Sequence, residues 1–211
     1  MQIYGAVFGG RHFMEDYGAI MNYAMISPPK VKENYVDIAG GDSAIDLTEA
    51  VGGIVYEDGS IEFKFTLFSA EKACQMRNDL HGKRMEILLE REPEFYYNGR
   101  LSCAKEGQAG RTYEVYFTAK VHPYKYARTE TIYVESAGRQ EKEILLQNDR
   151  MPVMPRICVE GDVSLEYGGA RYRMKAGEYQ IPEITLQEGL NRVRLSGSGE
   201  VRFIYRKGRL I

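Results

Sequence analysis

The feature that most constrains the fold of this chain is the alternation of apolar and polar residues with period two. It is clearest in residues 61–67, where every second residue is Ile, Phe or Leu, and it recurs in 113–121 and 201–205. Successive side chains of a strand point to opposite faces of a sheet, so such segments are typical of half-buried β-strands. The sequence therefore predicts a mainly β protein.

Three dipeptides are candidates for tight turns between these strands: Asp58-Gly59, Asn98-Gly99 and Gly168-Gly169. Each supplies residues that tolerate the positive φ angles of two-residue hairpin turns. We therefore expect a hairpin at each of the three positions.

One segment departs from the strand pattern and predicts a single amphipathic helix. Ala73, Met76 and Leu80 recur at helical spacing, Ser69 is a suitable N-cap, and Gly82 is placed to end the helix. Such a helix would cover one face of a sheet with its apolar side.

The length of 211 residues suits one or two domains. We predict a first domain over residues 1–126 and a second over 127–211, with the linker within 123–147. The second half reads as a compact β-sandwich or jelly roll. Its predicted short strands, with glycine between them, are 156–161, 163–167, 171–175, 191–197 and 201–206.

Composition argues against several classes of protein. The net charge of -2 and the isoelectric point near 6.0 leave no basic surplus for a nucleic-acid backbone. Cys74, Cys103 and Cys158 are odd in number and far apart, which predicts free thiols in a reducing compartment. With neither a signal-peptide pattern nor an apolar run of spanning length, we expect a soluble protein made in a cytoplasm.

The residues that usually carry chemistry form no convincing constellation. His12, His81 and His122 are isolated, and no zinc-binding spacing is present. Glu92 and Glu94 could serve a glycosidase, but neighbouring carboxylates near a turn are usually surface residues. We therefore predict no catalytic residue, no cofactor and no metal site, and we predict that the chain is not an enzyme.

Residues 35–53, YVDIAGGDSAIDLTEAVGG, lie between turn residues and carry an apolar middle. Their acidic residues do not have the spacing of an EF-hand, and their glycine pairs do not form a dinucleotide cradle. A long loop with buried-seeking residues should pack either on its own domain or on a neighbouring subunit. The residues proposed for a subunit interface are Tyr35, Asp37, Ile45, Asp46, Leu47, Glu49 and Val51.

Several phrases, in order along the chain, resemble the siphophage distal tail protein family. They are GRHFMEDYGAIM, ISPPKVKENYVDIAGGDSAIDLTEAVGG, VYEDGSIEFKFTL, LHGKRMEILLE, FYYNGRL, VHPYKYA and SGSGEVRFIYRKGRL. The resemblance implies a tail-tube-like β domain with a helix, followed by a galectin-like β-sandwich. It also implies a hexameric ring with an open channel, which joins the tail tube to the baseplate.

The same resemblance implies the partners and the location of the protein. A ring of this family would contact the tail tube protein, the tail-associated protein, the tape-measure protein and receptor-binding proteins. DNA would pass through the channel without specific binding, no membrane would be involved, and assembly in the bacterial host cytoplasm would place the protein at the tail tip of the virion.

The rival hypothesis is a carbohydrate-binding module that recognises host cell-wall polysaccharide. Tyr167, Tyr172 and Tyr179 could stack on sugar rings, although the chain has no tryptophan. These tyrosines also suit an ordinary sheet face at a wet boundary. Both hypotheses concern binding rather than catalysis.

Overall fold

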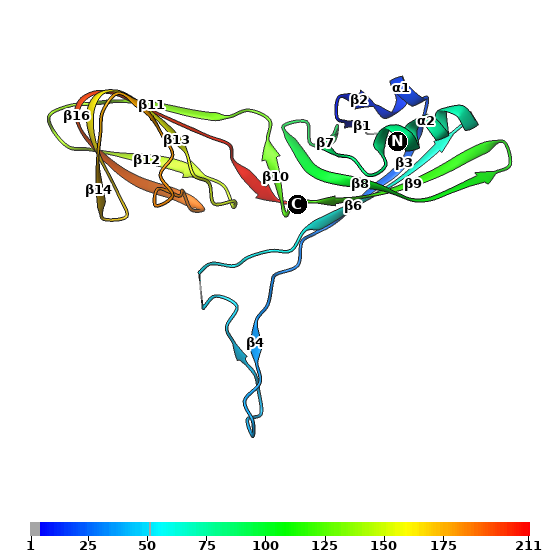
Figure 1. Ribbon diagram of the computed structural model, residues 1–211, viewed down its shortest axis with the longest axis horizontal. Helices are drawn as coiled ribbons and strands as arrows, with labels where there is room; N and C mark the ends of the chain where they lie inside the picture. The colour runs from blue at the N-terminus through cyan, green and yellow to red at the C-terminus, as the bar shows by residue number, and fades with distance from the viewer. Residues whose placement is uncertain (1–4, 51) are drawn as a thin grey trace. The chain divides into compact units, whose positions relative to one another are not determined.

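The structure is a computed structural model that describes residues 5–50 and 52–211, and it confirms the mainly β fold class (Figure 1). The chain divides into two compact units, Met1–Lys125 together with Ile211, and Tyr126–Leu210. Each unit has its own antiparallel sheet and its own hydrophobic core. No helix in the described part of the chain is long and apolar enough to cross a membrane.

The first unit is built on one antiparallel sheet whose strands follow the order β2-β1-β7-β8-β9-β6-β3. Strand β3 is therefore an edge of this path. The strands are β1 (Ala6–Phe8), β2 (Arg11–His12), β3 (Ile20–Ser27), β6 (Gly59–Leu67), β7 (Arg84–Leu89), β8 (Phe95–Ala109) and β9 (Thr112–Val121). β10 (Tyr124–Ala127) follows β9 in the chain and pairs with β17 (Gly208–Leu210).

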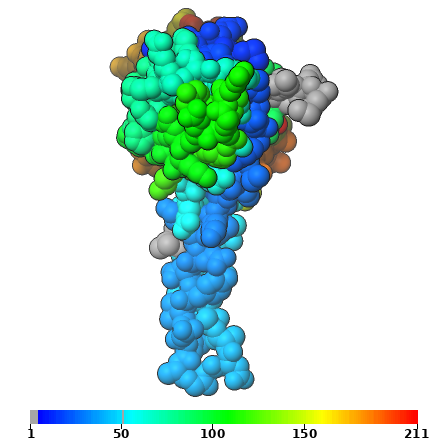
Figure 2. Space-filling view, turned by 90° about the vertical axis from the view of Figure 1, so that its right-hand side faces the viewer, coloured from blue at the N-terminus to red at the C-terminus, as the bar shows by residue number. Residues whose placement is uncertain are grey.

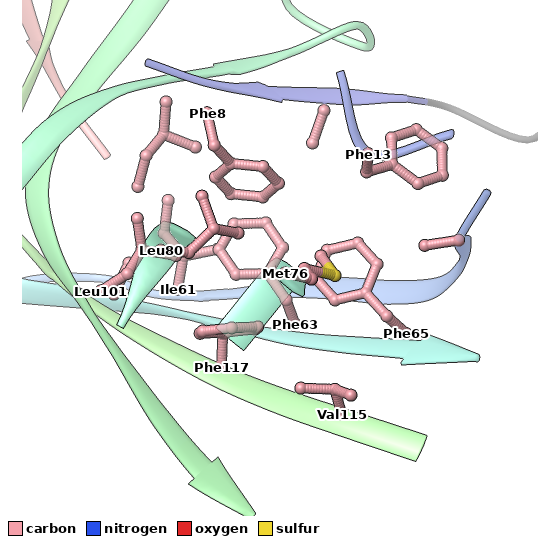
Figure 3. Close-up of a cluster of buried hydrophobic side chains, with 14 of the residues drawn as sticks. Phe8, Phe13, Ile61, Phe63, Phe65, Met76, Leu80, Leu101, Val115 and Phe117 are labelled. Atoms are coloured by element: carbon pink, nitrogen blue, oxygen red, sulfur yellow. The ribbon is translucent and has the colours of Figure 1, made fainter. Parts of the chain in front are cut away.

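The predicted helix is present as α2 (Ala70–Leu80), and Ser69 caps its N-terminus by accepting a hydrogen bond from the amide of Lys72. Its buried residues are Ala73, Met76 and Leu80, the three that the spacing indicated. Figure 3 shows Met76 and Leu80 beside the aromatic rings of the sheet. The helix thus covers the apolar face of the first sheet.

A second helix was not predicted. α1 (Phe13–Tyr17) is one turn long, begins after the N-cap His12 and ends at Gly18, whose φ of 63° is left-handed. Phe13 and Tyr17 are buried against the first core. A helix of five residues is too short to show a period of 3.6, so the expectation of a single helix was wrong.

The second unit is a six-stranded antiparallel sheet with the strand order β11-β16-β13-β14; β12 pairs with β16, and β15 pairs with β13. Alternate residues of these strands enclose a core that includes Leu165, Val193 and Phe203. The strands are β11 (Thr131–Ala137), β12 (Lys142–Asn148), β13 (Arg156–Tyr167), β14 (Ala170–Met174), β15 (Gly177–Tyr179) and β16 (Gly189–Tyr205).

Two of these strands correct the prediction of many short strands. The segments expected as 156–161 and 163–167 form one strand, β13, and those expected as 191–197 and 201–206 fall largely in β16. The glycines lie inside the strands, because the two backbones approach closely there. A Cβ on Gly199 would lie 1.8 Å from the carbonyl oxygen of Glu160, and the φ of Gly199 is 150°.

Only one of the three predicted hairpin turns is present. Gly168 and Gly169, with φ angles of 58° and 84°, connect β13 to β14. Asn98-Gly99 lies inside β8, where a Cβ on Gly99 would be 2.5 Å from the carbonyl oxygen of Lys120. Asp58-Gly59 marks the start of β6 rather than a turn, so both of these predictions were wrong.

Candidate functional site

Residues 28–58 leave the first sheet between β3 and β6 and return to it as an arm, seen in Figure 1 as the extension that carries β4 and in Figure 2 as a narrow column. Near the sheet, the amide of Lys32 donates to the carbonyl of Val55 over 2.8 Å. The amide of Glu57 donates to the carbonyl of Lys30, also over 2.8 Å. These bonds make the arm a narrow two-stranded ribbon. The arm begins at the ends of β3 and β6, which are neighbours in the sheet.

The outer part of the arm holds the interface candidates that the structure describes. β4 (Tyr35–Val36) pairs with β5 (Ile45–Asp46), so Tyr35 lies opposite Asp46. The amide of Leu47 donates to the carbonyl of Asn34 over 2.7 Å and extends the pairing. Asp37 and Glu49 lie on the same ribbon and are exposed, and Val51 lies outside the described residues.

Local hydrogen bonds shape this end of the arm. The amide of Thr48 donates to Asp46 Oδ1 over 2.9 Å, and Thr48 Oγ1 accepts from the amide of Asn34 over 3.0 Å. The hydrogen bonds from Thr48 lower the pKa of Asp46, and the charge of Asp46 raises the pKa of Tyr35. Asp46 is therefore ionised at neutral pH and helps to hold β5 beside β4.

The arm exposes apolar side chains that are not packed on its own unit. Five of them are between 46% and 56% exposed. They are Tyr35, Val36, Ile38, Ile45 and Val55. An isolated two-stranded ribbon is only marginally stable in water, and exposed apolar clusters mark interaction surfaces. These exposures favour an interaction surface over packing on the same domain.

Sequence reasoning did not single out Val36, Ile38 or Val55 as interface residues. Ile38 lies inside the segment that was selected, but its apolar side chain was not weighed. Val55 lies beyond that segment, on the returning strand of the ribbon. The signal that could have found it is the apolar run Ile54-Val55-Tyr56 directly before the acidic Glu57.

The carboxylate pair considered for catalysis has a different role. Glu92 accepts hydrogen bonds from Tyr97 Oη over 2.6 Å and from Lys125 Nζ over 2.8 Å, while Glu94 is exposed. Burial would raise the pKa of Glu92, but the bonds from Lys125 and Tyr97 outweigh it and lower the pKa. Glu92 therefore stabilises the connection before β8 as an ionised hydrogen-bond acceptor.

Replacing Glu92 with glutamine should lower the free energy of unfolding by about 1–2 kcal/mol at neutral pH, because hydrogen bonds to a charged group are lost. The pKa of Glu92 is depressed in the folded state, so its contribution is present above the unfolded pKa and is lost as pH falls through the folded pKa. Urea unfolding at neutral and at acid pH measures both effects. A difference between the two proteins that grows at acid pH would contradict this role.

The histidines and acidic residues do not gather into a metal site. His81 is the C-cap residue of α2, and its Nδ1 accepts a hydrogen bond from the amide of Cys103 over 2.9 Å. Among residues 5–50 and 52–211, no group of three or more His, Cys, Asp or Glu side chains could hold a metal ion. The arm therefore remains the main candidate site.

The tyrosines considered for sugar binding serve the second unit itself. Tyr167 Oη lies 2.7 Å from the carbonyl oxygen of Thr185 and 3.0 Å from Asn191 Oδ1, and its single proton is donated between these two acceptors. Tyr179 Oη donates to the carbonyl of Lys175 over 3.0 Å. All three tyrosine rings, including that of Tyr172, pack against the second core, so these residues act as supports of the sheet.

The fold of this chain, with two units in succession, is similar to that of a solved phage tail hub protein. The structure is similar to the crystal structure of SPP1 Dit (gp 19.1), which is described as a paradigm of the hub adsorption apparatus in Gram-positive-infecting phages, with a TM-score of 0.70. The match covers 97% of this chain and 99% of that chain at 14% sequence identity. The predicted resemblance to distal tail proteins is thus confirmed at the level of the fold.

Comparisons of sequence alone gave no such match. No protein-family model matches this chain, and no curated protein matches it. The likeness therefore rests on the arrangement of strands and helices over nearly the whole chain rather than on shared residues.

Proposed function

We propose that this chain is a structural protein of a siphophage or prophage tail tip, where it forms a hexameric ring that joins the tail tube to the baseplate. The observation that carries the proposal is the similarity to SPP1 Dit over 97% of this chain and 99% of that chain. A match over nearly the full length of both chains supports the role of a whole hub protein rather than of one shared module.

The exposed features of the first unit suit assembly of identical copies. Strand β3 ends the path of the sheet, and unpaired sheet edges invite pairing with another chain unless assembly covers them. The arm presents apolar residues that a different patch on the next copy would bury. Contacts between two different patches close into a ring when the rotation between neighbours allows it. In this proposal, the first unit is the tail-tube-like ring former and the second is a galectin-like sandwich.

The remaining parts of the proposal concern the partners. The ring would dock on the tail tube protein and serve as a platform for the tail-associated, tape-measure and receptor-binding proteins. DNA would pass through its channel without specific binding, which suits a chain with a net charge of -2. The role is structural rather than catalytic, and assembly would take place in the cytoplasm of the bacterial host.

The test is to assemble phage particles from a genome that lacks this protein and to image them by electron microscopy. We expect particles without a functional tail tip, and expression of the protein from a plasmid should restore normal tails. Normal tails in its absence would contradict the proposed function.

A further inference from the structure

Three cations stand in a row across adjacent strands on the face of the first sheet that is opposite to its core. Arg84 of β7 is paired in register with Arg100 of β8, and Arg100 is paired with Lys120 of β9. We call these three residues the basic row. Like charges directly opposite one another destabilise a sheet. An anionic partner would relieve this repulsion between the three cations.

The described residues supply little negative charge to the basic row. Lys120 forms an ion pair with Asp58 over 3.4 Å. Arg84 Nε donates to the amide oxygen of Asn98 over 3.0 Å, and Arg100 donates to the carbonyl of Gly82 over 2.5 Å. These partners are neutral, and neither arginine forms an ion pair with a carboxylate within the parts of the chain that the structure describes.

The basic row lines a hollow that is open to solvent and has a volume of about 300 Å³. Ser102 and His122 complete its polar lining, and Asp58 contributes the single carboxylate. A hollow of this composition can receive carboxylate groups, because guanidinium groups bind carboxylates with paired hydrogen bonds.

The outer part of the arm has the complementary charge. Residues 33–50 contain five acidic side chains and no lysine, arginine or histidine. None of the five forms an ion pair with any of the described residues. They are Glu33, Asp37, Asp42, Asp46 and Glu49.

The arm of a given copy is held away from that copy's own basic row. Asp58, beside the row, is at the foot of the arm, and the acidic part follows only after the paired segments around Lys32 and Val55. Lys30 lies beside Glu57 and Tyr35 lies beside Asp46, so at about 3.3 Å per residue Asp46 is roughly 20 Å along the arm from Asp58. Figures 1 and 2 show the arm extended away from the first sheet. The two charged surfaces can therefore meet only between copies.

We propose that the acidic part of the arm of one copy docks on the basic row, Arg84, Arg100 and Lys120, of a second copy. The proposal rests on the proposed function, since it names the surface that receives the arm during ring assembly. The apolar residues of the arm supply area, and the carboxylates select the surface and the orientation. Charge pairing of this kind speeds association and excludes wrong contacts, and salt weakens it.

Charge reversal on each side tests the proposal. The arm variant carries Asp37→Lys, Asp42→Lys and Glu49→Lys, and the row variant carries Arg84→Glu and Arg100→Glu. Each variant alone should self-associate at least tenfold more weakly than the native chain in sedimentation experiments over a concentration and salt series. An equimolar mixture of the two should assemble again, because each arm then meets a row of opposite charge.

The matched control reverses two exposed cations of the second unit, Arg173→Glu and Lys175→Glu, and should assemble as the native chain does. Circular dichroism and thermal unfolding verify that every variant is folded. If the row variant assembles normally while the arm variant does not assemble, the basic row is not the surface that receives the arm. Assembly through the arm would still be supported. If the native chain stays monomeric at millimolar concentration, both proposals are contradicted.

A further outcome would assign the basic row to another partner. If reversal of Arg84 and Arg100 leaves self-association unchanged but removes binding of labelled duplex DNA, the row contacts nucleic acid and the docking proposal is overturned. If the row variant loses self-association and the mixture restores it, the arm is the occupant of the row.

Discussion

Replacing three exposed apolar residues of the arm with serine, Tyr35→Ser, Ile45→Ser and Val55→Ser, should leave the protein monomeric at concentrations where we expect the native chain to assemble. Full burial of such a side chain contributes about 1.5–3 kcal/mol, and because these three are already about half buried, covering the rest contributes about 1 kcal/mol each. Every 1.4 kcal/mol is about tenfold in affinity, so the triple variant should bind roughly a hundredfold more weakly. Light scattering over a dilution series measures the mass of each protein.

The serine variant should keep the stability of the native chain, because these side chains are about half exposed and lie outside the first core. The matched control replaces Leu145 and Leu190, two exposed apolar residues of the second unit, with serine. It should assemble normally. An arm variant with native mass at every concentration would show that the arm does not hold copies together.

Replacing Phe63 with alanine should lower the free energy of unfolding by about 3–5 kcal/mol, the range for removal of a large aromatic residue from a packed core. Phe63 is 1% exposed, and its ring centroid lies 5.1 Å from that of Phe8 and 6.0 Å from that of Phe65 (Figure 3). Denaturant unfolding followed by circular dichroism measures the loss.

Ile132→Ala is the comparison for the core variant, because Ile132 is 61% exposed and lies on a strand of the second unit. Surface changes of this kind usually stay within about 0.5 kcal/mol. Equal stability losses in the two variants would mean that the cluster around Phe63 is not the core of the first unit.

The strands and the main helix could be predicted because their signal is local. Alternation in 61–67 and 113–121 corresponds to β6 and β9, and the spacing of Ala73, Met76 and Leu80 corresponds to α2. Each pattern shows which side of the strand or helix is buried, because the apolar residues recur with the period of that element.

The wrong predictions of turns and short strands concern glycines whose position is set by tertiary contacts. Gly99 and Gly199 lie in strands because neighbouring backbones leave no room for a Cβ, and a single sequence does not show that approach. The same residue type at Gly168-Gly169 does mark a turn. Glycine alone therefore cannot separate a turn from a crowded strand.

One part of the candidate site could be predicted from the sequence and the other could not. The arm could be selected from its bracketing glycines and apolar middle, although the sequence did not show that it is a paired ribbon. The basic row could not be selected, because Arg84, Arg100 and Lys120 become neighbours only through the pairing of β7 with β8 and of β8 with β9. Strand register is a long-range property that local patterns leave open.

The central claim is that this chain uses its exposed arm to bind copies of itself. Electron microscopy of the purified protein at high concentration tests it most directly. We expect closed annuli with a central opening and six-fold symmetry, which disappear in the variant with serine at Tyr35, Ile45 and Val55. Single particles of one chain at every concentration, with the arm intact, would contradict the claim.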